Sequence, residues 1–282
     1  MRLRRIQTST ITDAVVLLTE GFGELCKTTW HDCLLKIAQH ADRQGGGTIG
    51  YIASKDGADI GICLTLPMPR AVFEPEERQA MNLAGFYLRP RYQWMAALFL
   101  REVMMTRDAE YIDVTPSQSM QKINEHLGFM TCARGLSVVP LGLAVWRHAR
   151  RTRVFAFDTG MATLLPETVA RIMEDHAELG CICLIVEQDG ICNPLILAHK
   201  SRAGLSSARI ILAKDRIFVR QILGPLARYL LRNQVFFLEL DADSDRFVRE
   251  SFQRSRSYCV QSTELKLTSE IDHTYSELVF VK

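Results

Sequence analysis

Several signals that would assign this chain to a common class are missing from its 282 residues. No apolar run of about 18 residues could form a transmembrane helix, and the first residues alternate charged with apolar side chains, unlike the apolar core of a signal peptide. The sequence has no Gly-x-Ser-x-Gly, no Walker loop and no two cysteine pairs spaced to bind zinc. We therefore expect a cytoplasmic protein that has no metal and no membrane contact.

Charge and cysteine content exclude two further classes. The formal net charge is only +2, and basic and acidic residues are balanced in both halves, so we expect no nucleic-acid partner. The eight cysteines are scattered and lie mostly in apolar stretches, unlike a disulfide framework. Cys181 and Cys183 would share one face of a strand, where reduced cysteines pack as small apolar residues. A metal-binding pair is the alternative there.

What the chain does contain is an internal repeat. Residues 47–66 and 180–199 each consist of a β-rich run, an Asp-Gly pair and a second β-rich run. Asp56-Gly57 and Asp189-Gly190 supply the small residues that adopt positive φ in a tight hairpin turn. The repeat is too long for a solenoid unit, so it indicates two copies of one α+β domain.

Beyond the hairpin, each half continues with a strand, a long apolar helix, a strand, a short helix and a closing strand. This order predicts two domains, residues 1–146 and residues 147–282. In the first half we expect strands at 2–7, 81–88 and 111–114, and helices starting near 10 and at 29–40, 94–105 and 117–127. In the second half we expect strands at 209–213, 235–240 and 276–281, and helices starting near 166 and at 217–231 and 245–252.

The segment between the halves, residues 147–153, is rich in arginine. It predicts either a solvated linker or a contact with a phosphate or an acidic partner. His176 falls on the apolar side of its helix, which favours a hydrogen-bonded core histidine.

Two short motifs carry a resemblance to a known family. Residues 88–93, Leu-Arg-Pro-Arg-Tyr-Gln, follow a strand and precede an apolar helix, and residues 123–129 end a short helix in Gly-Phe. With the order of elements, these motifs resemble the GNAT superfamily, the acyl-CoA N-acyltransferase fold. The whole chain is similar to bacterial two-repeat members of that superfamily, in which residues 224–229 and 273–277 have counterparts. The resemblance implies two GNAT-like repeats, each a mixed, mainly antiparallel sheet flanked by helices.

The resemblance also implies a site for acetyl-CoA or another acyl-CoA, a co-substrate, in residues 1–146. The first turn of a helix offers backbone amides and the positive end of its dipole to a pyrophosphate. Leu98 departs from the family, which has glycine at that position, and its bulk would point toward the phosphates. The residues that the resemblance assigns to this site are Leu88, Gln93, Trp94, Met95, Ala96 and Ala97.

Two residues are candidates for the acyl-transfer chemistry. Asn124 stands where much of the superfamily has a tyrosine that protonates the leaving thiolate, and asparagine can donate a hydrogen bond but cannot act as an acid. The alternative is an ordinary exposed helix residue. Asp113, at the end of a predicted strand, is the best-placed general base. Its alternative is a helix cap or a turn partner.

The predicted function is transfer of an acyl group, acetyl in the first instance, from acyl-CoA to an amine by direct attack in a ternary complex. The acceptor amine would belong to a small molecule, a sugar or a peptide, and His31 and Asp32 could line its pocket or form a solvated first turn. Residues 147–282 would shape the acceptor site or serve a structural role, in a monomer or a homodimer. The alternative is a binding or regulatory module that kept the fold and lost the chemistry.

Overall fold

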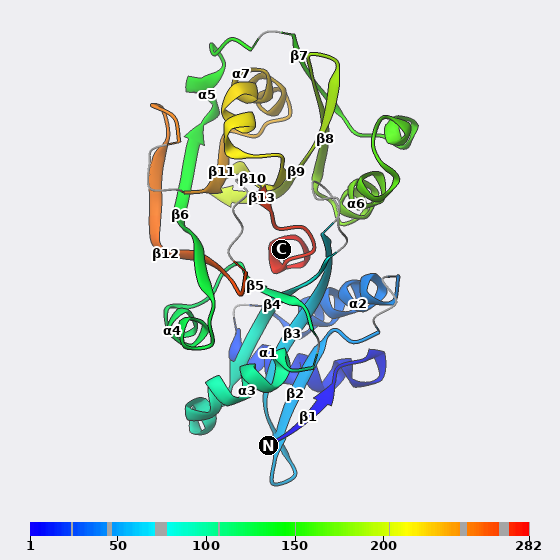
Figure 1. Cartoon of the computed structure of the whole chain (residues 1–282), viewed down its shortest axis with the longest axis vertical. Helices are drawn as coiled ribbons and strands as arrows, with labels where there is room; N and C mark the ends of the chain where they lie inside the picture. Colours follow the sequence, from blue (N-terminus) through cyan, green and yellow to red (C-terminus); the bar gives the residue numbers. More distant parts are fainter. Residues whose placement is uncertain are drawn as a thin grey trace.

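The computed structural model describes residues 1–23, 25–43, 47–70, 78–106, 108–149, 151–202, 204–242, 247–264 and 271–281. Over these residues, thirteen strands form one sheet, with helices on both of its faces (Figure 1). The strands follow one another in the order β1-β2-β3-β4-β5-β12-β6-β11-β10-β9-β8-β7, and β13 pairs with β10. None of the described helices is both long and apolar enough to span a membrane.

The first half of the chain builds one end of the sheet. Its elements are β1 (Arg2–Arg5), η1 (Thr8–Thr10), α1 (Ile11–Gly21), α2 (Lys27–Arg43), β2 (Gly50–Lys55), β3 (Ala58–Arg70), β4 (Arg78–Leu88), η2 (Pro90–Met95), α3 (Ala96–Met104), β5 (Glu110–Asp113), α4 (Gln118–His126), β6 (Met130–Pro140) and α5 (Leu141–Ala144).

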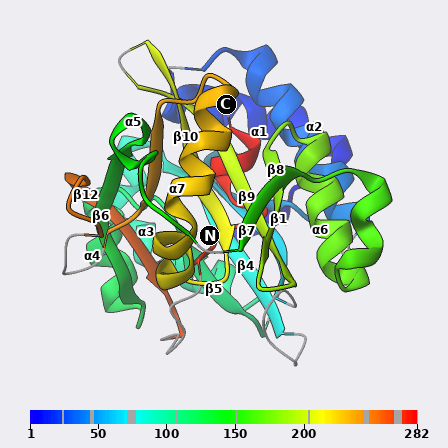
Figure 2. The same cartoon turned by 90° about the horizontal axis from the view of Figure 1, so that it is seen from above.

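The second half builds the other end, and α7 lies over its strands when the molecule is seen from above (Figure 2). Its elements are β7 (Thr152–Ala156), η3 (Thr159–Leu164), α6 (Glu167–Glu178), β8 (Ile182–Gln188), β9 (Ile191–Arg202), β10 (Leu205–Ala213), α7 (Arg216–Arg232), β11 (Phe237–Asp241), β12 (Phe252–Ser262), β13 (Ile271–Asp272) and α8 (Glu277–Phe280).

The pairing of the strands repeats from one half to the other. From β1 to β4 and from β7 to β10 each strand pairs with the next in antiparallel fashion, and β4·β5 and β10·β11 are then parallel. Both Asp-Gly pairs form two-residue turns, with φ of 53° and 80° at Asp56 and Gly57 and 51° and 81° at Asp189 and Gly190. The predicted α+β class, with a mixed and mainly antiparallel sheet flanked by helices, is confirmed.

At the centre of the sheet the two halves exchange strands. β12, from the second half, lies between β5 and β6, and β6, from the first half, pairs with β11. Each half therefore covers the open edge that the other would leave, and edge strands left bare are sites of unwanted pairing. One continuous sheet is the result.

The fourth strand of each half carries a bulge. Ile62 and Leu64 of β3 pair with Tyr87 and Ala84, so β4 has one more residue than its partner over this stretch. Gly85 lies in the extra segment with φ of 53°, and a Cβ added to it would lie 3.0 Å from Leu18. A glycine is needed because of both the backbone conformation and the close approach.

The bulge of β10 lies at the matching place. There Ile210 and Leu212 pair with the adjacent residues Leu197 and Ile196 of β9. The same irregularity in both fourth strands is further support for an internal repeat.

Two predictions of secondary structure near the C-terminus are wrong. Residues 245 and 246 of the helix predicted at 245–252 lie outside the described residues, and residues 247–251 are not helical, while Phe252 begins β12. The strand predicted at 276–281 is the short helix α8. Leu278, Val279 and Phe280 are consecutive and all buried, because this segment is enclosed on every side, and such a run has no periodicity that separates helix from strand.

The apolar helix predicted at 94–105 also begins differently. Residues Pro90–Met95 form a 3₁₀ helix, and the α-helix starts only at Ala96.

Candidate functional site

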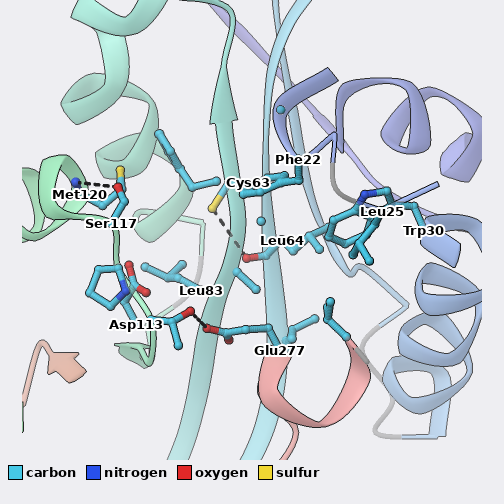
Figure 3. A pocket seen from close by; sticks show the side chains of 18 of the residues that line it. Phe22, Leu25, Trp30, Cys63, Leu64, Leu83, Asp113, Ser117, Met120 and Glu277 are labelled. Carbon is cyan, nitrogen blue, oxygen red and sulfur yellow. Dashed lines mark hydrogen bonds between the residues drawn. The ribbon is translucent and has the colours of Figure 1, made fainter. Parts of the chain in front are cut away.

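A cavity of about 710 Å³ opens in the first half of the molecule, beside the bulge of β4 (Figure 3). The last β4·β5 pair is Leu83 with Asp113, and beyond it the two strands no longer pair. Gly85 and Phe86 on β4 and Thr115 on the segment after β5 line the space beyond that pair. The bulge and the short β5 therefore create the cavity.

The walls of the cavity are mostly apolar, and its polar groups are few. Apolar side chains come from the end of α1, from α2, from β3 and β4, and from α3, α4 and the C-terminal segment. Among the described lining residues, those with ionisable or hydroxyl side chains are Cys63, Asp113, Thr115, Ser117 and Glu277.

Asp113 is a buried carboxylate at the end of β5. The Nδ2 of Asn124 donates a hydrogen bond to its Oδ2 at 3.0 Å, and the backbone amide of Thr115 donates another. Burial raises the pKa of Asp113 to about 7, and the nearby charge of Glu277 acts in the same direction, against these two hydrogen bonds. The group can therefore exchange a proton near neutral pH.

Glu277, on α8, is a second carboxylate at the same cavity. Its Oε1 accepts a hydrogen bond from Thr115 Oγ1 at 2.6 Å, while its Oε2 is buried and has no hydrogen-bond partner among the described residues. Burial raises the pKa of Glu277. Thr115 thus holds both carboxylates, one through its backbone amide and one through its hydroxyl.

Asn124 contacts Asp113 but does not line the cavity. It is fully buried, and its Nδ2 also donates to Oε1 of Gln261 on β12 at 3.0 Å. The alternative of an exposed helix residue is therefore wrong. Ser117, not Asp113, caps α4 by accepting a hydrogen bond from the amide of Met120. Asp113 does act as a turn partner, through Thr115.

Of the six residues that the family resemblance assigns to acyl-CoA, Leu88 ends β4 and the other five lie in η2 and the first turn of α3. None of the six lines the cavity. They separate into two sets. Leu88, Met95 and Ala96 are buried in the core beneath these helices, while Gln93, Trp94 and Ala97 are exposed.

Leu98, which departs from the family pattern, does not line the cavity either. It is 37% exposed and Trp94 is 74% exposed, so both side chains face outward. Lys55 Nζ, on the hairpin between β2 and β3, lies 5.5 Å from the ring centroid of Trp94 and 5.9 Å from that of Tyr92. A cation and two aromatic rings therefore gather on the surface near the start of α3.

Other residues singled out from the sequence lie elsewhere. His31 and Asp32 do not line the cavity, although the adjacent Trp30 does. His176 is fully buried, with Nδ1 at 2.7 Å from the carbonyl oxygen of Ile172, which confirms a core histidine. In the segment between the halves, Arg147 pairs with Glu250 at 2.8 Å, and Arg150 lies outside the described residues.

Sequence reasoning missed Glu277 and Thr115 as site residues. Glu277 lies at the far end of the chain, in a segment expected to be a strand. The only available signal was the likeness of residues 273–277 to a pattern in related chains, which indicates no contact with Asp113.

In the second half, a buried polar cluster lies at the end of β11, the strand that corresponds to β5. Asp241, at the end of β11, accepts hydrogen bonds from Arg209 Nη2 and Tyr258 OH, both at 2.9 Å, and Nε2 of His273 contacts its other oxygen. Arg209 also contacts the hydroxyl of Tyr258. Burial acts to raise the pKa of Asp241, but the charges of His273 and Arg209 outweigh it and hold this pKa well below its ordinary value.

Comparison with known proteins gives matches among solved structures only. No protein-family model matches the sequence, and no curated protein matches it. A GCN5-related N-acetyltransferase from Anabaena variabilis aligns with a TM-score of 0.62 and 10% identity, over 93% of this chain and 72% of that one. One from Kribbella flavida gives a TM-score of 0.61 and 11% identity, over 93% and 70%.

Eis1 from Mycobacterium abscessus gives a TM-score of 0.53 and 11% identity, over 93% of this chain and 73% of that one. Identities this low show the fold alone. The chain has the fold of the GCN5-related N-acetyltransferases, the GNAT superfamily.

Proposed function

We propose that this protein is an acyltransferase that moves an acyl group, acetyl in the simplest case, from acyl-CoA to an amine by direct attack in a ternary complex. The observation that carries this proposal is the position of Asp113. This ionisable carboxylate faces a cavity at the point where β4 and β5 separate, in a chain with the GNAT fold.

The residues at the start of α3 fit a phosphate-bearing co-substrate. No acidic residue lies in the first turn of η2 or of α3, and no described side chain caps either helix, so the positive end of the helix dipole is not neutralised there. Lys55 and Arg91 are cations near these turns. When bound, acyl-CoA supplies an activated acyl group as its thioester, and Gln93 and Trp94 are the exposed residues placed to contact its nucleotide.

The matching helix of the second half does not fit such a group. Asp215 caps α7 by accepting a hydrogen bond from the amide of Phe218 at 2.6 Å, and its negative charge would repel a phosphate. In this proposal residues 1–146 bind acyl-CoA, and residues 147–282 complete the acceptor side of the cavity through Glu277.

Asp113 acts as the general base. With a pKa of about 7, a substantial fraction of the group is ionised near neutral pH and can accept the proton that the attacking amine loses. The nitrogen–carbonyl bond forms while the carbon–sulfur bond breaks, and CoA leaves as a thiolate that takes its proton from solvent. Asn124 is a positioning residue, because it holds Asp113 without touching the cavity.

The test is thiol release by the full-length protein from acetyl-CoA and longer acyl-CoAs in the presence of a panel of amines. We expect Asp113→Asn to lower kcat by about 10²–10⁴-fold. Asp189→Asn is the matched control, because Asp189 lies in a surface turn whose positive φ asparagine also tolerates, and it should leave the rate unchanged. Full activity of Asp113→Asn would contradict the proposed role of this residue.

A GNAT-fold binding or regulatory module without catalysis is the second candidate. The observation in its favour is Asn124, which is buried where much of the superfamily has an acidic tyrosine and cannot protonate a thiolate. Binding of acetyl-CoA and desulfo-CoA without thiol release over the whole amine panel would establish this candidate instead.

A further inference from the structure

We propose that the acceptor is a cationic amine on an apolar body, with its ammonium group between Asp113 and Glu277 and its body against the apolar wall that contains Trp30. The proposal rests on the function proposed above and names the substrate class of the same site. It narrows the acceptor from any amine to amphipathic primary amines such as arylalkylamines.

The first argument is the charge of the cavity wall. Asp113 and Glu277 both line the cavity, and within the described part of the chain no lysine, arginine or histidine lines it. No described basic side chain forms an ion pair with either carboxylate. Buried carboxylates are normally paired with a cation or hydrogen-bonded throughout, so this pair lacks a positive partner.

The second argument comes from the other repeat, in which the equivalent carboxylate is paired with a cation of the protein itself. The bulge of β4 follows Ala84, and the bulge of β10 follows Ile210. The residue before each of these, Leu83 or Arg209, pairs with Asp113 of β5 or Glu239 of β11 respectively. Glu239 is therefore the register equivalent of Asp113. Its carboxylate is ion-paired with Arg202, whose Nε lies 2.9 Å from Oε1.

The third argument is the hydrogen-bonding capacity left at the pair. Thr115 occupies Oε1 of Glu277, and Oε2 of Glu277 is buried without a partner among the described residues. A primary ammonium carries three donors on one charged nitrogen, enough to satisfy Glu277 Oε2 and still reach Asp113. A secondary or tertiary amine has fewer donors.

Three basic groups of the second half, Arg209, His273 and Lys200, act on Glu277 through their charge. None of them lines the cavity, and Arg209 and His273 contact Asp241 instead. The groups whose charges interact with the carboxylate pair are Cys63 on β3, Lys200 on β9, Arg209 on β10, Tyr258 and Cys259 on β12, and His273 after β13.

The body of the ligand is indicated by the rest of the wall. Phe22 and Trp30 form a tilted aromatic pair with ring centroids 5.8 Å apart, and Leu25, before α2, and Ile37, on α2, add to the apolar surface. A polyhydroxylated sugar would bury its hydroxyl groups here without partners, which costs binding energy. An aromatic or branched aliphatic group gains by burying apolar surface in a cavity of this size.

The test measures binding of small probes to the full-length protein by calorimetry, with and without desulfo-CoA. The probes are 2-phenylethylamine, its neutral counterpart 2-phenylethanol, and glucosamine. We expect 2-phenylethylamine to bind at least 10-fold more tightly than either of the others. Comparison of buffers with different ionisation enthalpies should show proton release near pH 7, because an ammonium group lowers the pKa of the neighbouring carboxyl groups.

Glu277→Gln should weaken binding of 2-phenylethylamine at least 10-fold and leave that of 2-phenylethanol unchanged. Glu167→Gln, on the exposed first turn of α6, is the control and should change neither. Circular dichroism and the Tm of Glu277→Gln verify that it folds. Equal binding of amine and alcohol, no effect of Glu277→Gln, or no binding with or without desulfo-CoA would overturn the inference.

The experiments distinguish a failure of this inference from a failure of the proposed function. Amine binding as expected, without thiol release from any acyl-CoA, would leave the cationic site and remove the transferase. Thiol release with glucosamine or a peptide amine, but not with 2-phenylethylamine, would leave the transferase and remove this acceptor class.

Discussion

The two halves of this chain share a strand pattern and differ in what lies at the end of the fifth strand. In the first half, the ends of β4 and β5 separate around a cavity that contains Asp113. In the second half, β13 pairs with the end of β10, and the polar cluster around Asp241 fills the interior. One copy of the fold therefore has a cavity at these strand ends, and in the other the corresponding strands carry a paired polar cluster.

The second half also contributes to the cavity of the first half. The segment that ends in α8 runs between the halves (Figure 1), where Asn82 of β4 donates a hydrogen bond to the carbonyl oxygen of Thr274 at 3.1 Å. Tyr275 stacks on His40 with ring centroids 4.0 Å apart, and its hydroxyl donates to Asp175 at 2.8 Å. These contacts hold Glu277 at the cavity, so the site depends on both ends of the chain.

The largest expected effect is a difference in the free energy of unfolding between variants of Asp241 and Asp113. Asp241→Asn leaves the guanidinium of Arg209 buried without its counter-ion, and we expect the free energy of unfolding to fall by about 3–5 kcal/mol. Asp113→Asn removes a carboxylate that has no cation, so at pH 8 we expect the free energy of unfolding to rise by about 1–2 kcal/mol. Urea denaturation of both variants measures the two values.

The pH dependence of the Asp113 variant provides its control. Because the pKa of Asp113 is raised in the folded state, the unfolded chain ionises this group first, and stability is lost progressively as the pH rises from about 4 to about 7. The advantage of Asp113→Asn should therefore shrink as the pH falls through this range and vanish below about pH 4. A change of the same sign in both variants at pH 8 would contradict the distinction between the two carboxylates.

A smaller effect concerns His176, which accepts a hydrogen bond from the amide of Tyr275 at 3.2 Å if its Nε2 is unprotonated. Burial lowers the pKa of His176 to about 4, from 6.5. The unfolded chain then binds more protons between these values, so stability falls as the pH decreases from 7 to 5. We expect this residue to account for about 1–2 kcal/mol of that loss.

The variant His176→Gln measures this contribution. It should be less stable than the wild type at pH 7 and should lose less stability on going to pH 5, as followed by urea denaturation at both values. An identical pH dependence of the two proteins would show that protonation of His176 does not loosen the C-terminal segment.

The smallest expected effect concerns the starts of α3 and α7, the helices that follow β4 and β10. Asp215→Ala removes the cap of α7 and should lower the free energy of unfolding by about 1 kcal/mol. Affinity for desulfo-CoA should not change, because the proposed nucleotide site lies at α3. Gln93→Glu is the counterpart: a negative charge at the exposed turn should weaken desulfo-CoA binding several-fold. Tighter binding by Asp215→Ala would place the nucleotide in the second half, because this variant removes a negative charge at the start of α7.

Local chemistry explains which parts of the fold could be predicted. Asp56-Gly57 and Asp189-Gly190 adopt the positive φ values that their residue types favour, and Gly128 has φ of 92° after α4, as a C-terminal cap requires. Asp113 lies at the end of a strand as expected, while its catalytic role stays a prediction. The turn, cap and strand-end predictions succeeded because each depends on residues within one or two turns of chain.

Contacts between distant segments explain what could not be predicted. Residues 276–281 were expected to be a strand because Leu278, Val279 and Phe280 are apolar without periodicity, and packing between the halves decided otherwise. The burial of Asn124 depends on Gln261, a residue of the exchanged strand β12. Neither outcome has a local cause.

The sequence by itself determined that the chain is an α+β protein with a repeated hairpin, because turn residues and apolar periodicity act over a few neighbouring positions. Only the tertiary structure decided that β6 and β12 exchange places, that a cavity opens at Asp113 while Asp241 joins a polar cluster, and that Glu277 meets Thr115 and Asp113. Burial and charge pairing between segments more than 100 residues apart set these features, and no local pattern encodes them.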